Sequence, residues 1–400
     1  MSAPTIVHQS DWSMIRKIWP LLIAAALGLV PFTVMSNFLP AIASDAGVGV
    51  DLMGSFRGLG GIAALIVGVA VAPLLDRLSR TAVATIALSV LAVGCLASLL
   101  GHPIAWVMFC LLIGAGTAVL NPAVAALSAD RFESGHDAAR AATLVSSTAT
   151  LTAVLAAPVL ALPAVLWGWR ADMIGVFVAL LVVAALIARM PSDQQGRTAL
   201  GYLEALRTAT RRPGATDLLM VSLLRTTAFM GSLAYISAAF DERFGLSTGW
   251  FSLVWSTSGL AFFLGNFGGG KYLHRRGTEV AIPMMVAAIC TATMAMVVLY
   301  TAPTLWSAWI AVAVVSASHA VIAAGVTTAV VRSAGPARGT VLGLNGAAQA
   351  LGTFLGAAIA GAALAVGGWV AVATALGAVT AIALYFALRA QTPGYAQISS

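Results

Sequence analysis

A short polar string interrupts the apolar sequence near residue 76, and a related string follows half a chain later. The first reads Ala-Pro-Leu-Leu-Asp-Arg-Leu-Ser-Arg over residues 72–80, and the second reads Gly-Lys-Tyr-Leu-His-Arg-Arg-Gly over residues 270–277, at an offset of 198. Arg140 and Arg338 keep this offset, and the Gly-Trp pairs at 168–169 and 368–369 nearly keep it. A chain that repeats such marks at half its length indicates two related structural units joined in the middle.

The composition indicates a membrane-embedded chain. Hydrophobic residues make up 60% of the 400 residues and charged residues only 9%, with a mean hydropathy of +0.96. A soluble chain of this length needs more charge to cover its surface. The net charge of +7 is spread over loops rather than gathered on one face, so nucleic acid is not an expected partner.

Twelve apolar runs are long enough to cross a bilayer, which takes roughly 20 helical residues. Helices are expected, because an open strand exposed to lipid would leave its backbone groups unpaired. The runs cover residues 18–42, 52–75, 81–101, 103–127, 140–162, 170–189, 218–240, 249–270, 279–300, 305–330, 338–362 and 369–389.

The basic residues predict how these runs cross the membrane. Of the 21 lysines and arginines, 17 fall on the side that carries both termini, Arg170 and Arg243 fall on the other, and Arg57 and Arg225 fall within runs. Because loops rich in lysine and arginine stay in the cytoplasm, both termini are expected there, in a plasma or inner membrane. The first apolar run is too long for a cleaved signal peptide and is expected to remain as an anchor.

One long polar connection divides the chain. Residues 191–217 are expected to link an N-terminal six-helix bundle (1–190) to a C-terminal six-helix bundle (218–400). Within this linker, Leu200, Leu203 and Leu206 recur at helical spacing among polar residues, which fits a short amphipathic helix on the membrane surface. A mobile linker with accidental periodicity is the alternative.

The two polar strings resemble the pattern Gly-x-x-x-Asp-Arg-x-Gly-Arg, which joins the second and third membrane helices of major facilitator superfamily transporters. The first run ends in Phe-Leu-Pro-Ala-Ile-Ala-Ser-Asp over residues 38–45, similar to the drug and sugar efflux branch of the arabinose efflux permease type. The resemblance implies an all-α membrane protein with twelve helices in two pseudo-symmetric six-helix bundles. It also implies a secondary active transporter that alternates access, in the leading hypothesis a proton-coupled exporter (an antiporter).

The same resemblance implies that the polar strings form a latch that locks one access state, with the first string meeting the eleventh span. The latch candidates are Asp76, Arg77, Arg80, Arg140, His274, Arg275 and Arg338. A plain set of cytoplasmic anchors is the alternative. This chain departs from the family where Cys110 replaces an arginine that precedes Gly-Ala-Gly in the fourth span, and that arginine is implicated in proton coupling.

Ionisable groups within the bilayer are costly and usually functional. All 14 carboxylates fall in loops or at the ends of runs, whereas Arg57, Arg225 and His319 lie within runs. A cationic interior suits an anionic, zwitterionic or neutral polar solute, so organic-anion uptake or exchange is the alternative transport function. Arg57 could instead extend outward to Asp45 or Asp51, Arg225 could extend to lipid phosphates, and His319 could bond to a neighbouring helix. An unperturbed histidine titrates near ~6.5, so His319 could also carry a proton.

Neutral polar and aromatic residues complete the candidate binding set. They are Asn37, Asn121, Tyr235, Trp255, Asn345 and Gln349, with Phe229 as a further stacking candidate. The chain shows no phosphate-binding Gly-x-x-x-x-Gly-Lys and no nucleophile motif, and Cys95, Cys110 and Cys290 lack metal-ligand spacing. No enzyme activity, cofactor or metal is therefore expected. The expected partners are a small-molecule substrate, membrane lipid and protons.

One chain contains both bundles, so a monomer is expected to suffice. A function of another class also stays open: a membrane sensor or scaffold that binds a ligand without moving it.

Overall fold

The computed structural model describes residues 11–68, 79–132, 135–191, 214–276, 278–333 and 338–390, and the regular structure in these ranges is helical. The first half contains α1 (Asp11–Leu27), α2 (Val30–Asn37), α3 (Leu39–Asp45), α4 (Val50–Ile66), α6 (Arg80–Ser98), α7 (Pro103–Ala129), α8 (Gly135–Trp167) and α9 (Trp169–Ala188). The second half contains α11 (Ala215–Phe244), α12 (Thr248–Arg276), a 3₁₀ turn (Thr278–Val280), α13 (Ala281–Thr301), α14 (Leu305–Ser333) and α15 (Arg338–Arg389).

These helices agree with the predicted twelve-helix layout. In the described part of the chain, nine helical segments are long and apolar enough to cross a membrane, or ten if α3 and α4, bent by 107°, form one broken span. The first predicted run is broken between α1 and α2, where Pro31 enters the first turn of α2. The last two predicted runs share α15, whose backbone leaves the helical region at Gly367 and Gly368. Gly368 adopts a φ of +62°, which only glycine tolerates readily.

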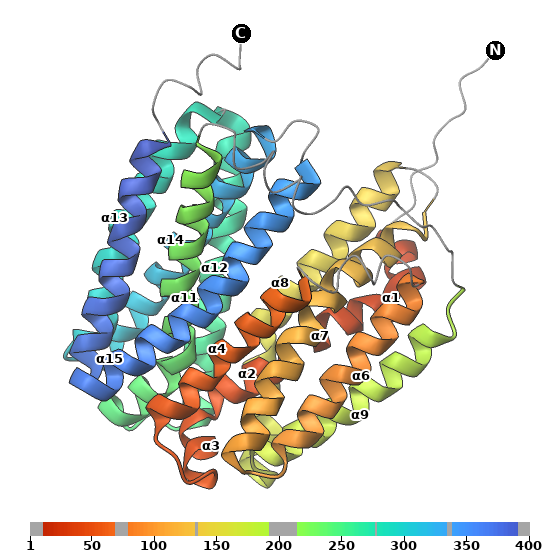
Figure 1. The fold of residues 1–400 in the computed structure, drawn as a ribbon, viewed down its shortest axis with the longest axis horizontal. Helices are drawn as coiled ribbons and strands as arrows, with labels where there is room; N and C mark the ends of the chain where they lie inside the picture. The colour runs from red at the N-terminus through yellow and green to blue at the C-terminus, as the bar shows by residue number, and fades with distance from the viewer. Residues whose placement is uncertain are drawn as a thin grey trace.

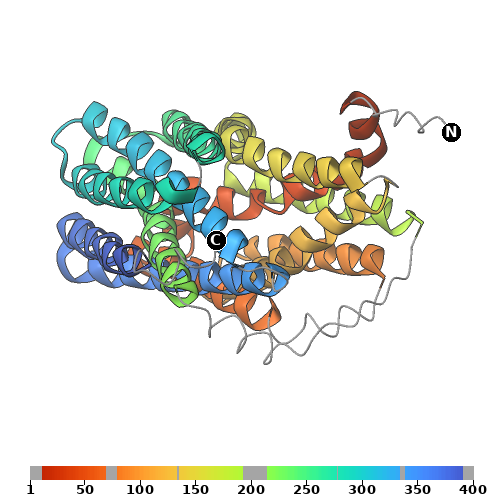
Figure 2. The same ribbon diagram turned by 90° about the horizontal axis from the view of Figure 1, so that it is seen from above.

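The helices form two bundles that follow the halves of the sequence (Figure 1). Helices α1 to α9 pack on one another, as do α11 to α15, and α1 begins at the same end of the molecule at which α15 ends. Figure 2 shows the two bundles side by side from above. The fold is therefore an all-α membrane architecture of two six-helix bundles.

The most extensive contacts between the bundles join α4 with α15 and α8 with α12, and α11 adds smaller contacts with α2, α3 and α4. A Cβ added to Gly61 would lie 2.4 Å from the Ala350 carbonyl oxygen, and one added to Gly259 would lie 2.7 Å from that of Ala153. Gly61 and Gly259 stand 198 positions apart, the offset of the polar strings. Because both sites lack a side chain, the backbones approach closely at two related places.

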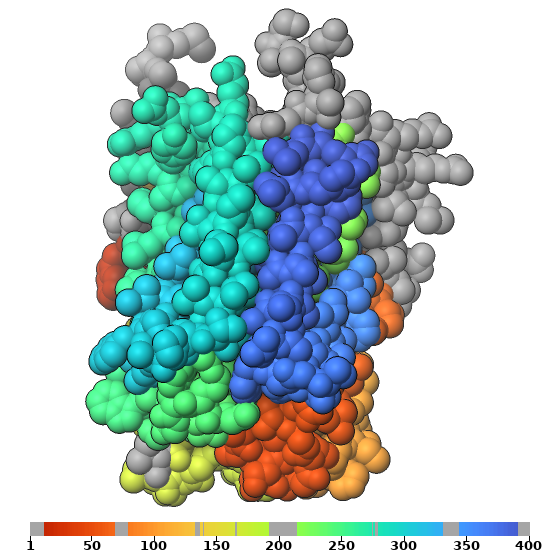
Figure 3. All heavy atoms as spheres, turned by 90° about the vertical axis from the view of Figure 1, so that its left-hand side faces the viewer, coloured from red at the N-terminus to blue at the C-terminus, as the bar shows by residue number. Residues whose placement is uncertain are grey.

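The bundles meet closely at the end opposite the chain termini. There the Ser237 hydroxyl of α11 donates to the Ser36 carbonyl of α2. In Figure 3, the orange surface of the first bundle lies directly below α15 and α11 at this end. The core of the first bundle contains fully buried Trp106 and Phe109, whose rings pack edge to face. Leu162 and Val366, by contrast, are largely exposed on the outside, as expected for residues that face lipid.

Candidate functional site

Six of the nine candidate binding residues form three pairs at related positions of the two halves. Asn37 and Tyr235, Arg57 and Trp255, and Asn121 and His319 are each 198 positions apart. The helix starts confirm this correspondence, because α4 begins at Val50 and α12 at Thr248. The two halves therefore share a scaffold and carry different side chains at equivalent points.

In the second bundle, Arg225 and His319 form one buried cluster. Arg225 is 5% exposed and donates to the Thr226 hydroxyl at 2.9 Å. His319 of α14 is fully buried, lies near enough to Arg225 to interact with it electrostatically, and has no hydrogen-bond partner on either ring nitrogen within the described residues. Its ring stacks on Phe229 at 5.3 Å, and Phe229 stacks on Phe262 at 5.3 Å. The cluster can thus offer a guanidinium and a free imidazole to a solute.

In the first bundle, Arg57 is the centre of a second cluster. Its guanidinium lies over the Phe32 ring at 5.7 Å, and Nη1 is buried without a partner among the described residues. The Cys110 thiol of α7 lies close enough to interact with this charge, and its sulfur is 3.7 Å from that of Met35. Arg57 is 9% exposed and therefore points into the bundle.

Among the described residues, Arg57 does not form the ion pair with Asp45 or Asp51 that the sequence left open. Asp45 accepts hydrogen bonds from Trp169 and Arg170, each at 2.8 Å. Arg170 also lies over the Trp169 ring at 4.6 Å. The carboxylate of Asp45 thus pins the start of α9 to the end of α3.

Tyr235 lies at the closed contact between the bundles. Its hydroxyl is 2.7 Å from the Asp51 carbonyl oxygen of α4 and 3.3 Å from that of Ala357 of α15. A Cβ added to Gly54 would lie 2.2 Å from the ring, and one added to Gly361 would lie 2.4 Å from the hydroxyl oxygen. The ring therefore fills a slot that two glycines leave open.

The other predicted binding residues differ in exposure. Asn37 and Asn345 are buried, and each has an amide oxygen without a partner among the described residues. Asn121 is exposed, and Gln349 is half-buried on α15. Trp255 is 7% exposed and packs against Phe251 at 6.4 Å.

The latch is described only in part. Asp76 and Arg77 lie outside the described residues, as do the side chains of His274 and Arg338 and the predicted amphipathic helix of the linker. Arg275 is exposed and Arg140 is half-buried on α8. Arg80 forms an ion pair with Asp130, at the end of α7 in its own bundle.

Sequence reasoning missed several residues that complete these clusters. Phe32 and Phe262 look like ordinary apolar residues in their runs, and nothing in the pattern singles them out. Asp130 carried a usable signal, because it is a carboxylate directly after the fourth span on the side where the basic loops gather.

The fold is shared with several solved membrane transporters. It matches the nucleoside transporter NupG with a TM-score of 0.75 and 14% identity, over 96% of this chain and 100% of that one. It matches a bacterial homolog of the human lysosomal transporter Spinster, in an inward-facing and unoccupied conformation, with a TM-score of 0.72 and 16% identity over 97% of each chain. The human organic anion transporter MFSD10 (TETRAN) matches with a TM-score of 0.66 and 16% identity, over 95% of this chain and 100% of that one.

The sequence pattern of one protein family covers most of the chain, from residue 21 to residue 357. Together with the solved structures, this match points to a membrane transporter rather than an enzyme. This chain belongs to the Major Facilitator Superfamily.

Proposed function

We propose that this chain is a secondary active transporter that moves a small organic anion across the membrane by alternating access. The observation that carries the substrate class is the pair of buried guanidinium groups, Arg57 in one bundle and Arg225 in the other. Neither has a carboxylate partner among the described residues. Arginine binds carboxylate and phosphate groups through charge-assisted hydrogen bonds, so an anionic solute would supply the missing partner.

The proposed movement is a rocking of residues 1–190 against residues 218–400 about the α4–α15 and α8–α12 contacts. Tyr235 and Ser237 hold the bundles together at the end away from the termini. With both termini in the cytoplasm, as the basic loops predict, this arrangement is inward-facing. Opening would require the Tyr235 hydroxyl to leave the Asp51 carbonyl.

The fold alone does not choose between solute classes, because nucleoside and organic-anion transporters share it. The charge of the interior favours an anion. The placement of Arg225, His319 and Phe229 supports a solute with an acidic group beside a flat, apolar part. The amide groups of Asn37 and Asn345 would add neutral hydrogen bonds.

For the direction of transport we propose export coupled to protons, supported by the resemblance of residues 38–45 to the efflux branch. Uptake or exchange of the anion is the second candidate. It is favoured by Cys110, which stands where the family's coupling arginine is expected, and by the cationic interior.

The substrate class can be tested with the purified transporter in a thermal-shift screen. Matched panels of organic anions, sugars and cationic drugs are compared for wild type, Arg225→Ala, Arg225→Lys and the control Arg189→Ala, which removes an exposed arginine at the end of α9. A solute that binds the native state raises the unfolding midpoint. Anions should stabilise wild type and Arg189→Ala, should lose this effect in Arg225→Ala, and should keep part of it in Arg225→Lys.

Flux in proteoliposomes then separates transport from sensing. A pH gradient that drives the stabilising anion out of the cytoplasmic side supports proton-coupled export. Anion movement that requires anion on the other side supports exchange. Binding without any flux would show a sensor or scaffold, and stabilisation by cationic drugs that survives in Arg225→Ala would overturn the anion proposal.

A further inference from the structure

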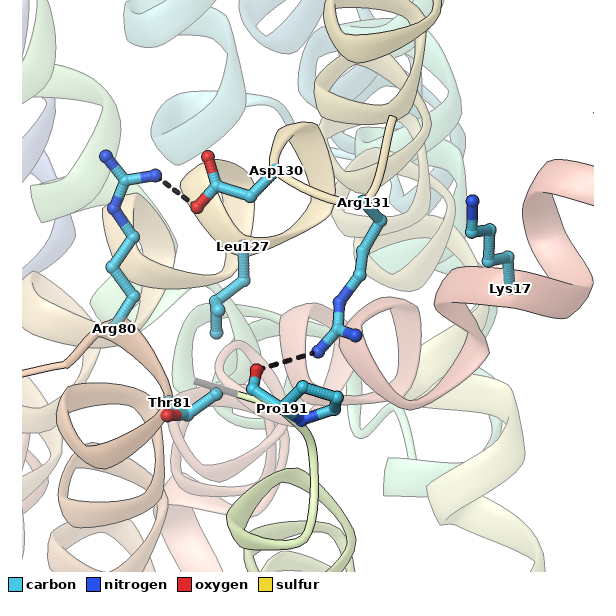
Figure 4. A pocket seen from close by; sticks show the side chains of 7 residues that line it. All are labelled: Lys17, Arg80, Thr81, Leu127, Asp130, Arg131 and Pro191. Atoms are coloured by element: carbon cyan, nitrogen blue, oxygen red, sulfur yellow. Dashed lines mark hydrogen bonds and ion pairs between the residues drawn. The ribbon is translucent and has the colours of Figure 1, made fainter. Parts of the chain in front are cut away.

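A cavity of about 220 Å³ lies in the first bundle, at the end that carries the chain termini (Figure 4). It is lined by Lys17 of α1, Arg80 and Thr81 of α6, Leu127 of α7, and Asp130, Arg131 and Pro191. Pockets for drug-sized ligands usually measure roughly 300–1,000 Å³. The cavity therefore suits a small group such as a phosphate with its nearest atoms.

The charges around this cavity are strongly unbalanced. The lining contains three cations, Lys17, Arg80 and Arg131, and one carboxylate, that of Asp130, which is already paired with Arg80. Figure 4 shows this pair on one side of Leu127 and Arg131 on the other. The lining therefore keeps two positive charges in excess.

Both excess cations hold only weak partners among the described residues. Arg131 reaches the Pro191 carbonyl oxygen at 3.5 Å, the long limit of a hydrogen bond. Lys17 lies over the Phe132 ring, with its ammonium nitrogen 4.8 Å from the ring centroid. Each side chain can therefore donate further hydrogen bonds to an anion without breaking a strong contact.

The local backbone favours the same ligand. Thr81 is the second residue of α6, and the Ser79 hydroxyl caps only the amide of Ala82. The first-turn amides of a helix lack partners within the helix and carry its partial positive charge. An anion in the cavity would thus meet two side-chain cations and the positive end of α6.

This cavity is separate from the candidate solute site. None of its lining residues comes from α11 to α15, so it does not lie between the bundles. On α1, Trp12 and Trp19 are exposed on either side of Lys17, as is typical of the level where lipid headgroups lie. The cavity therefore lies near the level expected of lipid headgroups.

We propose that this cavity binds a phosphate-type anion, whose source is either the headgroup of an acidic phospholipid or a free phosphate compound. The bound group would connect the middle of α1, the start of α6 and the end of α7 with the chain segment after α9. Its effect would be to stabilise the first bundle as a rigid unit.

The test measures the unfolding midpoint of the full chain in detergent, titrated separately with phosphatidylglycerol, phosphatidylcholine and inorganic phosphate. Wild type is compared with Lys17→Gln, Arg131→Gln and the control Arg16→Gln. Arg16 is an exposed neighbour of Lys17 on α1 that does not line the cavity. Lys17 is exposed as well, so its substitution should leave the fold intact even if that of Arg131 does not.

We expect saturable stabilisation of wild type and Arg16→Gln, with apparent affinity weakened about tenfold or more in Lys17→Gln and Arg131→Gln. A response to phosphatidylglycerol above that to phosphatidylcholine identifies lipid as the source. An equal response to inorganic phosphate identifies a free compound. The proposal is overturned if no anion stabilises wild type, or if Arg16→Gln weakens binding as much as Lys17→Gln, because the effect would then be general surface charge.

Discussion

A buried arginine without a carboxylate partner costs free energy, about 2.5–3.5 kcal/mol at the centre of a membrane helix on insertion scales. Arg57 and Arg225 are both buried without a carboxylate partner among the described residues, and His319 adds two ring nitrogens that have no partner there. Phe32 and Phe229 cover the apolar side of these groups with aromatic faces. The arrangement leaves polar atoms free to bind a ligand, and it lowers the stability of the unliganded protein.

Substitution of His319 tests whether these groups favour ligand binding over the stability of the unliganded protein. His319→Leu should leave the unfolding midpoint unchanged or raise it, because buried polar atoms without partners are removed. The same change should weaken binding of the stabilising anion about tenfold, whereas His319→Gln should retain most of it because the amide can still donate and accept. Thermal unfolding with and without the anion measures both effects. A lower midpoint in His319→Leu with unchanged affinity would assign His319 a structural role.

At the scale of helices, glycine decides where the bundles touch. Gly54 and Gly361 leave the slot that holds Tyr235, and Gly61 and Gly259 allow backbones to approach at the two helix pairs. Tyr235 comes from the second bundle and bonds to the carbonyl of Asp51 in the first. The closed end thus relies on one large ring and on two hydroxyl groups, those of Tyr235 and Ser237, that donate to backbone carbonyls of the first bundle, and it has no ion pair among the described residues.

Gly54→Ala should therefore open this end. The added methyl group would overlap the Tyr235 ring, and overpacking of this kind costs about 1–3 kcal/mol. Ser36→Cys places a buried reporter thiol at the contact. An impermeant maleimide added on the side away from the termini should label this thiol about tenfold faster when Gly54→Ala is also present than when it is absent. Background from the three native cysteines is subtracted using the chain without Ser36→Cys.

Gly175→Ala is the matched control, because a Cβ there has no neighbour within 4 Å. Its labelling rate should equal that of the parent. Equal rates in Gly54→Ala and Gly175→Ala would show that Tyr235 does not hold the bundles together.

The sequence predicted the spans and the two-bundle fold because apolar length and repeated polar marks depend on local residues alone. The role of Tyr235 could not be predicted, since its partner is a backbone carbonyl 184 positions away and any residue type could supply it. Exposure was equally hidden: Asn121 is exposed and Asn345 is buried, although both are asparagines within apolar runs. Which face of a helix meets a neighbour depends on packing that the local sequence does not encode.

At the scale of the whole molecule, the two halves have a related arrangement of helices but carry different polar side chains at equivalent positions. Arg57 corresponds to Trp255, and Asn121 corresponds to His319. A solute that bound both Arg57 and Arg225, as proposed, would therefore meet an arginine from each half but an imidazole from only one. Such asymmetry gives a bound molecule one preferred orientation on a nearly symmetric scaffold.

The two buried arginines, Arg57 and Arg225, also bear on the kinetics of the proposed transport cycle. In the proposed cycle an empty carrier would reorient with two positive charges that no carboxylate among the described residues compensates, in a medium of low dielectric constant, whereas a loaded carrier would reorient with this charge partly neutralised. Labelled anion should therefore enter proteoliposomes several-fold faster when unlabelled anion is inside, and Arg225→Gln should narrow this difference. Equal rates with and without internal anion would contradict the inference. If instead internal anion speeds entry, the solute acts as the counter-ion of its own carrier. Release of the solute on one side of the membrane would then depend on the concentration of solute on the other side.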